Sequence, residues 1–275
     1  MATETPTKFK LNTGAEIPAI GFGTWQDEDA QEKAVLEAIK AGYKHIDTAA
    51  VYGTERAVGQ AIKKCGVPRE ELFITTKLWN NKHHPDDVEE ALQHSLNELG
   101  LEAMEKLLET GKAKAIGVSN FSKAELQKLL AKTSVVPAVH QMEFHPWLQQ
   151  HEFSEWHNQK GIHITHYSPF GNQNTTYGLK AGFGKLIDEP VLAEIGKQYG
   201  KTAAQVVLAW GVSLGHSVLP KSKTPERIKS NLEGDFKLSP HDMEKISKLN
   251  RKIRFNDSSG EFGRDFFEDL EDKTG

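Results

Sequence analysis

Short apolar runs alternate along this chain with longer stretches in which apolar residues recur every three or four positions. The short runs have the length and composition of strands that are buried on both faces. The longer stretches, such as Ala30–Ala41 and Lys123–Lys132, have the spacing of amphipathic helices. The pattern predicts seven parallel strands, at Ile20–Thr24, His45–Thr48, Leu72–Lys77, Ala115–Ser119, Val136–Gln141, His163–Tyr167 and Ser217–Lys221.

A hairpin is expected before the first of these repeats. Lys8–Leu11 and Glu16–Ala19 have the pattern of two short strands, and the residues between them include Asn12 and Gly14, which suit a turn. Strands that alternate with helices predict a parallel sheet with right-handed crossovers. A barrel is the natural closure for so many units in one domain. We therefore expect an α/β fold of the (β/α)8 TIM-barrel type with an N-terminal β-hairpin.

The alternation fails once, in the segment ALQHSLNELGLEAMEKLLETGKAKAIGVSN at residues 91–120. Two helical stripes, Pro85–Leu99 and Met104–Thr110, follow each other there, and no strand pattern occurs between Trp79 and Lys114. A closed barrel of this class has eight strands. The sequence thus predicts a barrel that is one strand short, either incomplete or seven-stranded.

Length and composition fit one soluble domain. We expect a single domain over residues 1–275, with a core at 8–257 and an acidic tail at 258–275. The chain has 37% hydrophobic and 26% charged residues, a net charge of −4 and one cysteine, Cys65. It has no basic face for nucleic acid, no apolar run of the roughly 20 residues that a membrane helix needs, and no signal-peptide pattern. These features favour a cytoplasmic monomer that binds neither nucleic acid nor membrane.

Three titratable residues gather at the ends of neighbouring predicted strands, where barrel enzymes place their active sites. Asp47 and Tyr52 belong to HIDTAAVYG at residues 45–53, and Lys77 belongs to ITTKLWN. A lysine cation favours the tyrosinate, and a carboxylate holds that lysine charged and oriented, so the trio can donate a proton. The alternative is a structural Asp–Lys ion pair with a tyrosine packed beside it.

A second cluster, LPKSKTPERIKSN at residues 219–231, suits a phosphate. Lys221 and Ser222 finish the last predicted strand, Pro225 opens a helix, and Arg227 lies in its first turn. A solvated helix face is the alternative. No dinucleotide glycine motif follows a strand, which argues against a Rossmann dehydrogenase. No pair of histidines has metal-ligand spacing, so no metal is expected.

Taken together, these stretches resemble the aldo-keto reductases. GFGTW, HIDTAAVYG, TTKLWN, IGVSNFS, HQMEFHPWLQ, YSPFG and LPKSKTPERIKSNL stand in the family's order between about residues 8 and 257. The residues in these motifs are most similar to those of fungal aldehyde, glycerol and xylose reductases. The resemblance implies NADPH binding without a Rossmann fold and reduction of a small-molecule carbonyl to an alcohol, with proton donation by a tyrosine.

The resemblance also implies residue roles. Tyr52 would be the proton donor, supported by Lys77 and Asp47, and Trp25 and Trp79 would line the substrate pocket. The implied cofactor-binding residues are Gly23, Thr24, Trp25, Ser119, Asn120, Gln141, Tyr167, Ser168, Phe170, Lys221, Ser222, Arg227 and Asn231.

The resemblance also implies that different residues of that set contact different parts of the cofactor. Ser119, Asn120 and Gln141 would hold the nicotinamide carboxamide, and Tyr167 would stack on the ring. The others would contact the pyrophosphate (Ser168, Phe170), the 2′-phosphate (Lys221, Ser222, Arg227) and the adenine (Asn231).

The chain departs from the family pattern where Glu102 meets Ala103. On the order of 40 residues are missing there, somewhat more than one βα unit. In the family this segment holds the fourth strand, a loop over the substrate pocket and a catalytic histidine within His-Trp-Pro. His140 and His166 are expected to face the helices and not to replace it, because side chains alternate along a strand. His83 and His84 lie in a loop.

Three interpretations follow. The chain is an active NADP(H)-dependent reductase, a nucleotide-binding or structural relative that lost turnover with the histidine, or a product of a splicing or gene-model error. The acidic tail from Gly260 is expected to be mobile, unless Phe266 and Phe267 cover the pocket.

Overall fold

The chain divides into two compact units, which are described separately. In this computed structural model the described residues are 6–82, 84–100, 113–171, 183–257, 259–262, 267 and 270. Unit 1 comprises Met1–Ala19, Ala115–Val218 and Gly234–Gly275, and unit 2 comprises Ile20–Lys114 and Leu219–Glu233.

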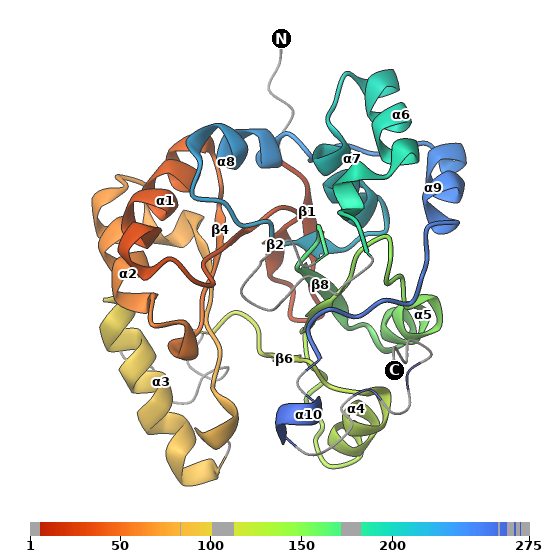
Figure 1. The fold of residues 1–275 in the computed structure, drawn as a ribbon. Helices are drawn as coiled ribbons and strands as arrows, with labels where there is room; N and C mark the ends of the chain where they lie inside the picture. The colour runs from red at the N-terminus through yellow and green to blue at the C-terminus, as the bar shows by residue number, and fades with distance from the viewer. Residues whose placement is uncertain are drawn as a thin grey trace. The chain divides into compact units, whose positions relative to one another are not determined.

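Unit 2 is built on a parallel sheet in the order β3-β4-β5. Phe22 pairs with Ile46, and Ile46 pairs with Ile74. Helices α1, α2 and α3 follow these strands in turn and lie together beside the sheet (Figure 1). The elements of unit 2 are β3 (Phe22–Gly23), α1 (Glu28–Ala41), β4 (His45–Asp47), the 3-10 helices η1 (Ala50–Tyr52), η2 (Arg69–Glu71) and η3 (Asn80–Lys82), α2 (Glu55–Lys64), β5 (Phe73–Thr75), α3 (Pro85–Leu99) and α8 (Pro225–Leu232).

Spacing of apolar residues explains how these helices pack. Helix α1 buries Ala34, Val35, Ala38 and Ile39, which share one face because helical residues three and four apart are neighbours. Helices α2 and α3 approach closely at Gly59, where an added Cβ would lie 2.5 Å from the Leu99 carbonyl oxygen.

Unit 1 contains the hairpin and a parallel sheet in the order β6-β7-β8-β9. In the hairpin, Phe9 of β1 pairs antiparallel with Ile17 of β2. The elements of unit 1 are β1 (Lys8–Lys10), β2 (Glu16–Pro18), β6 (Gly117–Ser119), α4 (Lys123–Leu130), β7 (Val139–Glu143), α5 (His151–Lys160), β8 (His163–Tyr167), the 3-10 helix η5 (Leu186–Asp188), α6 (Pro190–Tyr199), α7 (Ala203–Ser213), β9 (Ser217–Val218), α9 (Pro240–Ser247) and α10 (Ser259–Phe262).

One apolar cluster joins the helices of unit 1 to its sheet. It includes Phe144 after β7, Ile164 of β8, Leu192 of α6 and Trp210 of α7, each at most 2% exposed. Helix α7 is apolar on nearly all sides and buried along most of its length, as expected of a helix inside a core.

The structure confirms seven parallel strands, the hairpin and helix Pro85–Leu99. Some predicted strand bounds were wrong. Strand β7 begins at Val139 instead of Val136, because Pro137 has no N–H to donate to a ladder.

Three site residues also lie farther from strand ends than predicted. Strand β5 ends at Thr75, so Lys77 follows it by two residues. Strand β9 ends at Val218, before Pro220, so Lys221 and Ser222 lie in the segment that leads into α8.

Part of the acidic tail is anchored to unit 1, where mobility was expected. Phe267 and Leu270 are buried in the apolar cluster. The Arg254 guanidinium lies 3.8 Å from the centre of the Phe267 ring, a cation–π contact. Phe266, the predicted helix Met104–Thr110 and the Glu102–Ala103 junction lie outside the described residues.

Within the described ranges, no helix has the length and apolar character needed to cross a bilayer. Nor does that part of the chain hold a group of three or more His, Cys, Asp or Glu side chains suited to a metal ion.

Candidate active site

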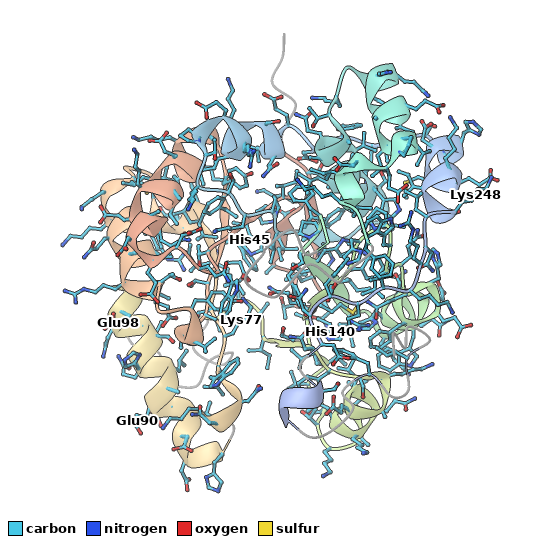
Figure 2. The ribbon with its side chains drawn as sticks, viewed as in Figure 1. His45, Lys77, Glu90, Glu98, His140 and Lys248 are labelled. Atoms are coloured by element: carbon cyan, nitrogen blue, oxygen red, sulfur yellow. The ribbon has the colours of Figure 1, made fainter. Side chains whose placement is uncertain are left out.

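Three of the predicted residues meet in unit 2, at the end of its sheet. Asp47 ends β4, Tyr52 ends the 3-10 helix η1, and Lys77 follows β5. The Lys77 Nζ lies 2.6 Å from Asp47 Oδ1 and 3.2 Å from the Tyr52 hydroxyl. Lys77 is labelled in Figure 2. The three side chains that the sequence predicted to form one cluster are therefore in contact, although they come from three separate segments.

The Lys77 ammonium group has three N–H donors, and the structure provides an acceptor for each. The third is the Thr48 carbonyl oxygen, at 3.0 Å. An ammonium group cannot accept a hydrogen bond. The Tyr52 oxygen therefore accepts from Lys77, and the hydroxyl proton of Tyr52 is directed elsewhere.

Charge around Lys77 keeps it protonated. Burial by itself would lower the pKa of Lys77, but the Asp47 carboxylate and the Tyr52 oxygen outweigh that cost, so the pKa of Lys77 is raised above its ordinary value. The Nζ also lies 4.9 Å from the centre of the Tyr52 ring. A permanent cation thus faces the phenol oxygen.

Buried threonines, which the sequence reasoning did not single out as a group, fix the backbone around this trio. The Thr24 hydroxyl donates to the Asp47 carbonyl oxygen at 3.0 Å, and the Thr54 hydroxyl lies 3.2 Å from those of both Thr24 and Thr48. All three threonines are fully buried. In the sequence, these threonines could have been noticed only as small polar residues within the motifs GTW, DTA and YGT.

The two tryptophans predicted for the substrate wall differ in their contacts. The Trp25 ring packs edge-on against Tyr52, with centroids 4.7 Å apart. Trp79 is 42% exposed and Trp25 is 39% exposed. Gly23 is buried on β3, directly before Thr24.

The predicted phosphate residues lie at the start of α8, also in unit 2. Pro225 is the first helical residue, as predicted, and the Ser222 hydroxyl accepts a hydrogen bond from the Thr224 N–H at 3.1 Å. Arg227 is exposed and has no ion-pair partner among the described residues. Asn231 is buried at the end of α8.

Two residues near this cluster were missed. The Asp27 carboxylate forms ion pairs with Lys221 and, at 3.1 Å, with Lys223. Lys223 was part of the quoted motif, but nothing in the sequence pointed to Asp27.

Unit 1 brings together the residues predicted for the nicotinamide. Ser119 of β6 is in register with Gln141 of β7, and the Asn120 N–H donates to the Gln141 carbonyl oxygen at 3.1 Å. The Tyr167 hydroxyl, at the end of β8, donates to the Asn120 side-chain oxygen at 2.8 Å.

Two of the unit 1 residues that were predicted to contact the cofactor have left-handed backbone. The φ angles are 58° at Asn120 and 47° at Ser168, each directly after a strand. Such conformations are uncommon for residues other than glycine and concentrate at functional sites. Phe170 follows shortly after and packs against the apolar cluster.

His140 and His166 face the helices of unit 1, as predicted, since His140 contacts α5 and His166 packs against Trp210 of α7. His140 Nδ1 is 2.7 Å from Nε2 of His157 on α5, and His166 Nε2 is 2.8 Å from His216 Nδ1. His84 is exposed, and His83 lies outside the described residues.

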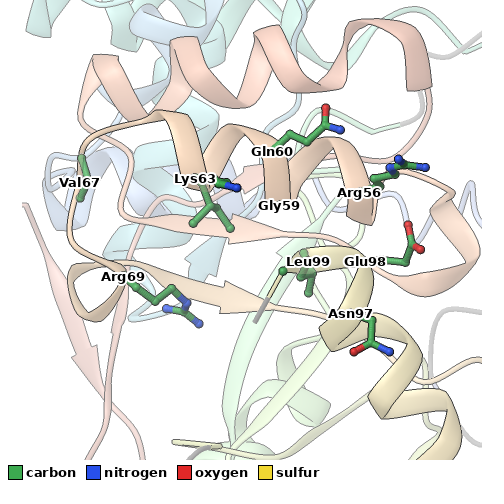
Figure 3. Close-up of a pocket in the computed structure, with 11 residues that line it drawn as sticks. Arg56, Gly59, Gln60, Lys63, Val67, Arg69, Asn97, Glu98 and Leu99 are labelled. Atoms are coloured by element: carbon green, nitrogen blue, oxygen red, sulfur yellow. The ribbon is translucent and has the colours of Figure 1, made fainter. Parts of the chain in front are cut away.

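A separate hollow of about 860 Å³ lies in unit 2, between α2, the turn after it and the end of α3 (Figure 3). Its polar lining includes Arg56, Lys63, Arg69 and Glu98, and it contains no residue of the predicted site.

Comparison with known proteins identifies the family. A model of the aldo/keto reductase family matches residues 19–104 and 99–251. An uncharacterized oxidoreductase of Schizosaccharomyces pombe is 41% identical over 294 residues, covering 91% of each chain. The glycerol 2-dehydrogenase (NADP(+)) of Saccharomyces cerevisiae is 41% identical, covering 89% of this chain and 91% of its own.

Solved structures give the fold. The Bombyx mori aldo-keto reductase in complex with NADP matches with a TM-score of 0.88 at 32% identity, covering 96% of this chain and 99% of its own. An aldo-keto reductase from Brucella melitensis matches with a TM-score of 0.81 at 38% identity, covering 90% of this chain and all of its own. The fold is therefore the TIM-barrel type of these reductases.

The comparisons also locate the shortened segment. The two stretches that match the family model meet within residues 99–104. The alignment with the S. pombe protein is 294 residues long, whereas 91% of this 275-residue chain is about 250 residues, so about 44 aligned positions are empty here. This agrees with the predicted loss of a segment at Glu102–Ala103.

Proposed function

Because the chain belongs to the aldo/keto reductase family, we propose that it is an NADPH-dependent oxidoreductase that reduces aldehydes or ketones to alcohols. The observation that supports this most is the Lys77 ammonium group, which donates to both Asp47 and the Tyr52 oxygen. A structural ion pair would not require a tyrosine hydroxyl as a third member.

In this proposal Tyr52 is the proton donor. When a carbonyl oxygen gains negative charge, the Tyr52 hydroxyl gives it a proton, and the Lys77 cation stabilises the tyrosinate that remains. Asp47 keeps Lys77 charged and holds its direction. Bound NADPH would supply the hydride that reduces the carbonyl carbon. Solvent then returns the proton to Tyr52.

The chemistry of the residues at the start of α8 fits a 2′-phosphate. Lys221, Ser222 and Arg227 offer cationic and hydroxyl donors beside the exposed N–H groups of a helix start. The Asp27 carboxylate already lies between two ammonium groups there, so the cluster accepts an anion. A 2′-phosphate distinguishes NADPH from NADH, hence the proposed preference. Asn231, Gly23 and Thr24 are proposed to line the same part of the cofactor site.

The residues of unit 1 are proposed to hold the nicotinamide end. Ser119, Asn120 and Gln141 offer a hydroxyl and two amides for the carboxamide, while Tyr167 offers an aromatic face. Ser168 and Phe170 are proposed to contact the pyrophosphate.

A second candidate function is nucleotide binding without turnover. The shortened segment at residues 99–104 favours it, because the resemblance places a catalytic histidine in the segment that is missing there. Under the first proposal, Tyr52 with Lys77 suffices for slow reduction.

One experiment separates these functions. NADPH fluorescence is titrated with the protein, and NADPH consumption is then followed with a panel of aldehydes and ketones. Quenching together with carbonyl-dependent consumption supports the reductase. Quenching without consumption supports the binding protein, and neither signal refutes both.

A further inference from the structure

Asp27 has an unusual place for an acidic residue. It precedes helix α1 in the position where an Asp side chain usually accepts a hydrogen bond from the first turn. Here its side chain makes no such bond, and both Gln26 and Asp27 have left-handed backbone, with φ angles of 69° and 61°. The carboxylate instead contacts Lys221 and Lys223, almost 200 residues later in the chain.

These lysines belong to the cationic segment that is proposed to bind the 2′-phosphate. Lys221 and Asp27 are both about 30% exposed in their side chains, whereas Lys223 is 63% exposed. Hydrogen bonds from Lys221 and then Lys223 lower the pKa of Asp27, so the carboxylate stays ionised at neutral pH. An anion therefore already occupies the donors that a phosphate would use.

A phosphate would nevertheless gain something that Asp27 lacks. It carries nearly two negative charges and can also pair with Arg227, which has no ion-pair partner among the described residues. Exchange of a carboxylate for a phosphate is thus favourable, but the cost of separating Asp27 from two lysines is subtracted from the binding free energy.

We propose that Asp27 acts as an internal competitor for the 2′-phosphate, occupying Lys221 and Lys223 in the free protein and weakening cofactor binding at its phosphate end. This rests on the proposed NADPH site. The opposite role, in which Asp27 pre-positions the lysines for the phosphate, predicts the opposite sign for the same substitution.

The test uses two nucleotides without nicotinamide, adenosine 2′,5′-bisphosphate and AMP, in calorimetric titrations. Asp27→Asn keeps the side-chain size and removes the charge. It is expected to bind the bisphosphate roughly three- to tenfold more tightly than the parent, as the loss of two partly exposed ion pairs implies, with AMP unchanged. Asp29→Asn is the matched control, since Asp29 is exposed in the first turn of α1 and has no ion pair among the described residues; it should bind as the parent does.

Asp27→Ser is a second variant, and melting temperatures verify that all variants fold. Weaker or unchanged bisphosphate binding by both Asp27 variants overturns the proposal, as does equal tightening for AMP. Absence of bisphosphate binding in every protein overturns it together with the NADPH assignment. Tighter bisphosphate binding in a protein that reduces no carbonyl supports the competitor role and refutes the proposed reaction alone.

Discussion

Acid should unfold this protein, because several buried histidines are neutral in the folded state. His140 and His157 form a chain in which every ring nitrogen has a fixed role. The Phe121 N–H donates to His140 Nε2, so His140 donates from Nδ1 to His157 Nε2, and His157 donates from Nδ1 to the Phe153 carbonyl oxygen. An added proton on either ring would face another N–H donor.

Burial is the main cause of the resulting pKa changes. It lowers the pKa of His45 and His157 to about 4 and that of His216 to about 3, and it lowers the pKa of His140 and His166 in the same direction. In the unfolded chain these five histidines take up protons as the pH falls through 6.5, whereas in the folded protein they stay neutral to lower pH. The contribution of these neutral histidines to folding stability is therefore present above pH 6.5 and is lost progressively as the pH falls below it.

The size of this loss of stability follows from the pH interval over which the histidines are protonated in the unfolded chain only. Between pH 6.5 and 5, each histidine with a folded pKa of about 4 or 3 lowers the free energy of unfolding by about 2 kcal/mol, at 1.36 kcal/mol per pH unit. His45, His157 and His216 together forfeit about 6 kcal/mol, against a typical total of 5–15 kcal/mol. We expect the protein to be marginal or unfolded at pH 5.

Urea unfolding at pH 7.5 and pH 5.5, followed by circular dichroism, measures the effect. His157→Gln cannot titrate, so its loss of stability between the two pH values should be smaller than that of the parent by about 1 kcal/mol or more. His151→Gln on the same helix removes an exposed histidine and should leave the loss unchanged. An identical loss in His157→Gln and the parent would refute the reasoning.

Three further predictions concern the cofactor, the packing and the shortened segment. Arg227→Ala should weaken NADPH binding by roughly tenfold or more and NADH binding little, because only NADPH carries the 2′-phosphate; equal losses in fluorescence titrations would remove the assignment. Gly59→Ala should lower the free energy of unfolding by about 1–3 kcal/mol, since its Cβ would lie 2.5 Å from the Leu99 carbonyl oxygen. Gly184→Ala is the control, because no atom lies within 4 Å of its added Cβ, and urea unfolding of this variant should differ little from that of the parent. Insertion, between Glu102 and Ala103, of the segment that the S. pombe relative has at this place should raise the melting temperature, the NADPH affinity and the aldehyde turnover. If the parent chain equals the restored chain in all three measurements, the segment is dispensable.

Strands and helices were predictable from the sequence where local pattern decides them. Helix α3 begins and ends as its apolar spacing, Pro85 and Gly100 indicate. Strand ends were less predictable, because they depend on which neighbour offers a ladder partner; the last strand stops before Pro220. The burial of Phe267 depends on tertiary contacts that no local pattern encodes.

The site could be predicted where motifs carried it and not where pairing is long-range. Asp47, Tyr52 and Lys77 were found because each lies at the end of a recognisable strand or shortly after it. The Asp27–Lys221 pair joins residues 194 positions apart, so only coordinates bring it to light. Left-handed Asn120 and Ser168 likewise follow from the chain's course after β6 and β8.

The central claim is that Tyr52 donates the proton in carbonyl reduction, and one comparison of variants tests it most directly. NADPH consumption with an aldehyde is measured for the parent, Tyr52→Phe and Tyr199→Phe, with NADPH binding measured in parallel. Tyr199→Phe removes a hydroxyl that donates to Asp242 in unit 1, so it controls for the loss of a tyrosine hydrogen bond. Tyr52→Phe should lose turnover by roughly 100-fold or more while it binds NADPH as the parent does, and Tyr199→Phe should keep both. Undiminished turnover in Tyr52→Phe would contradict the account.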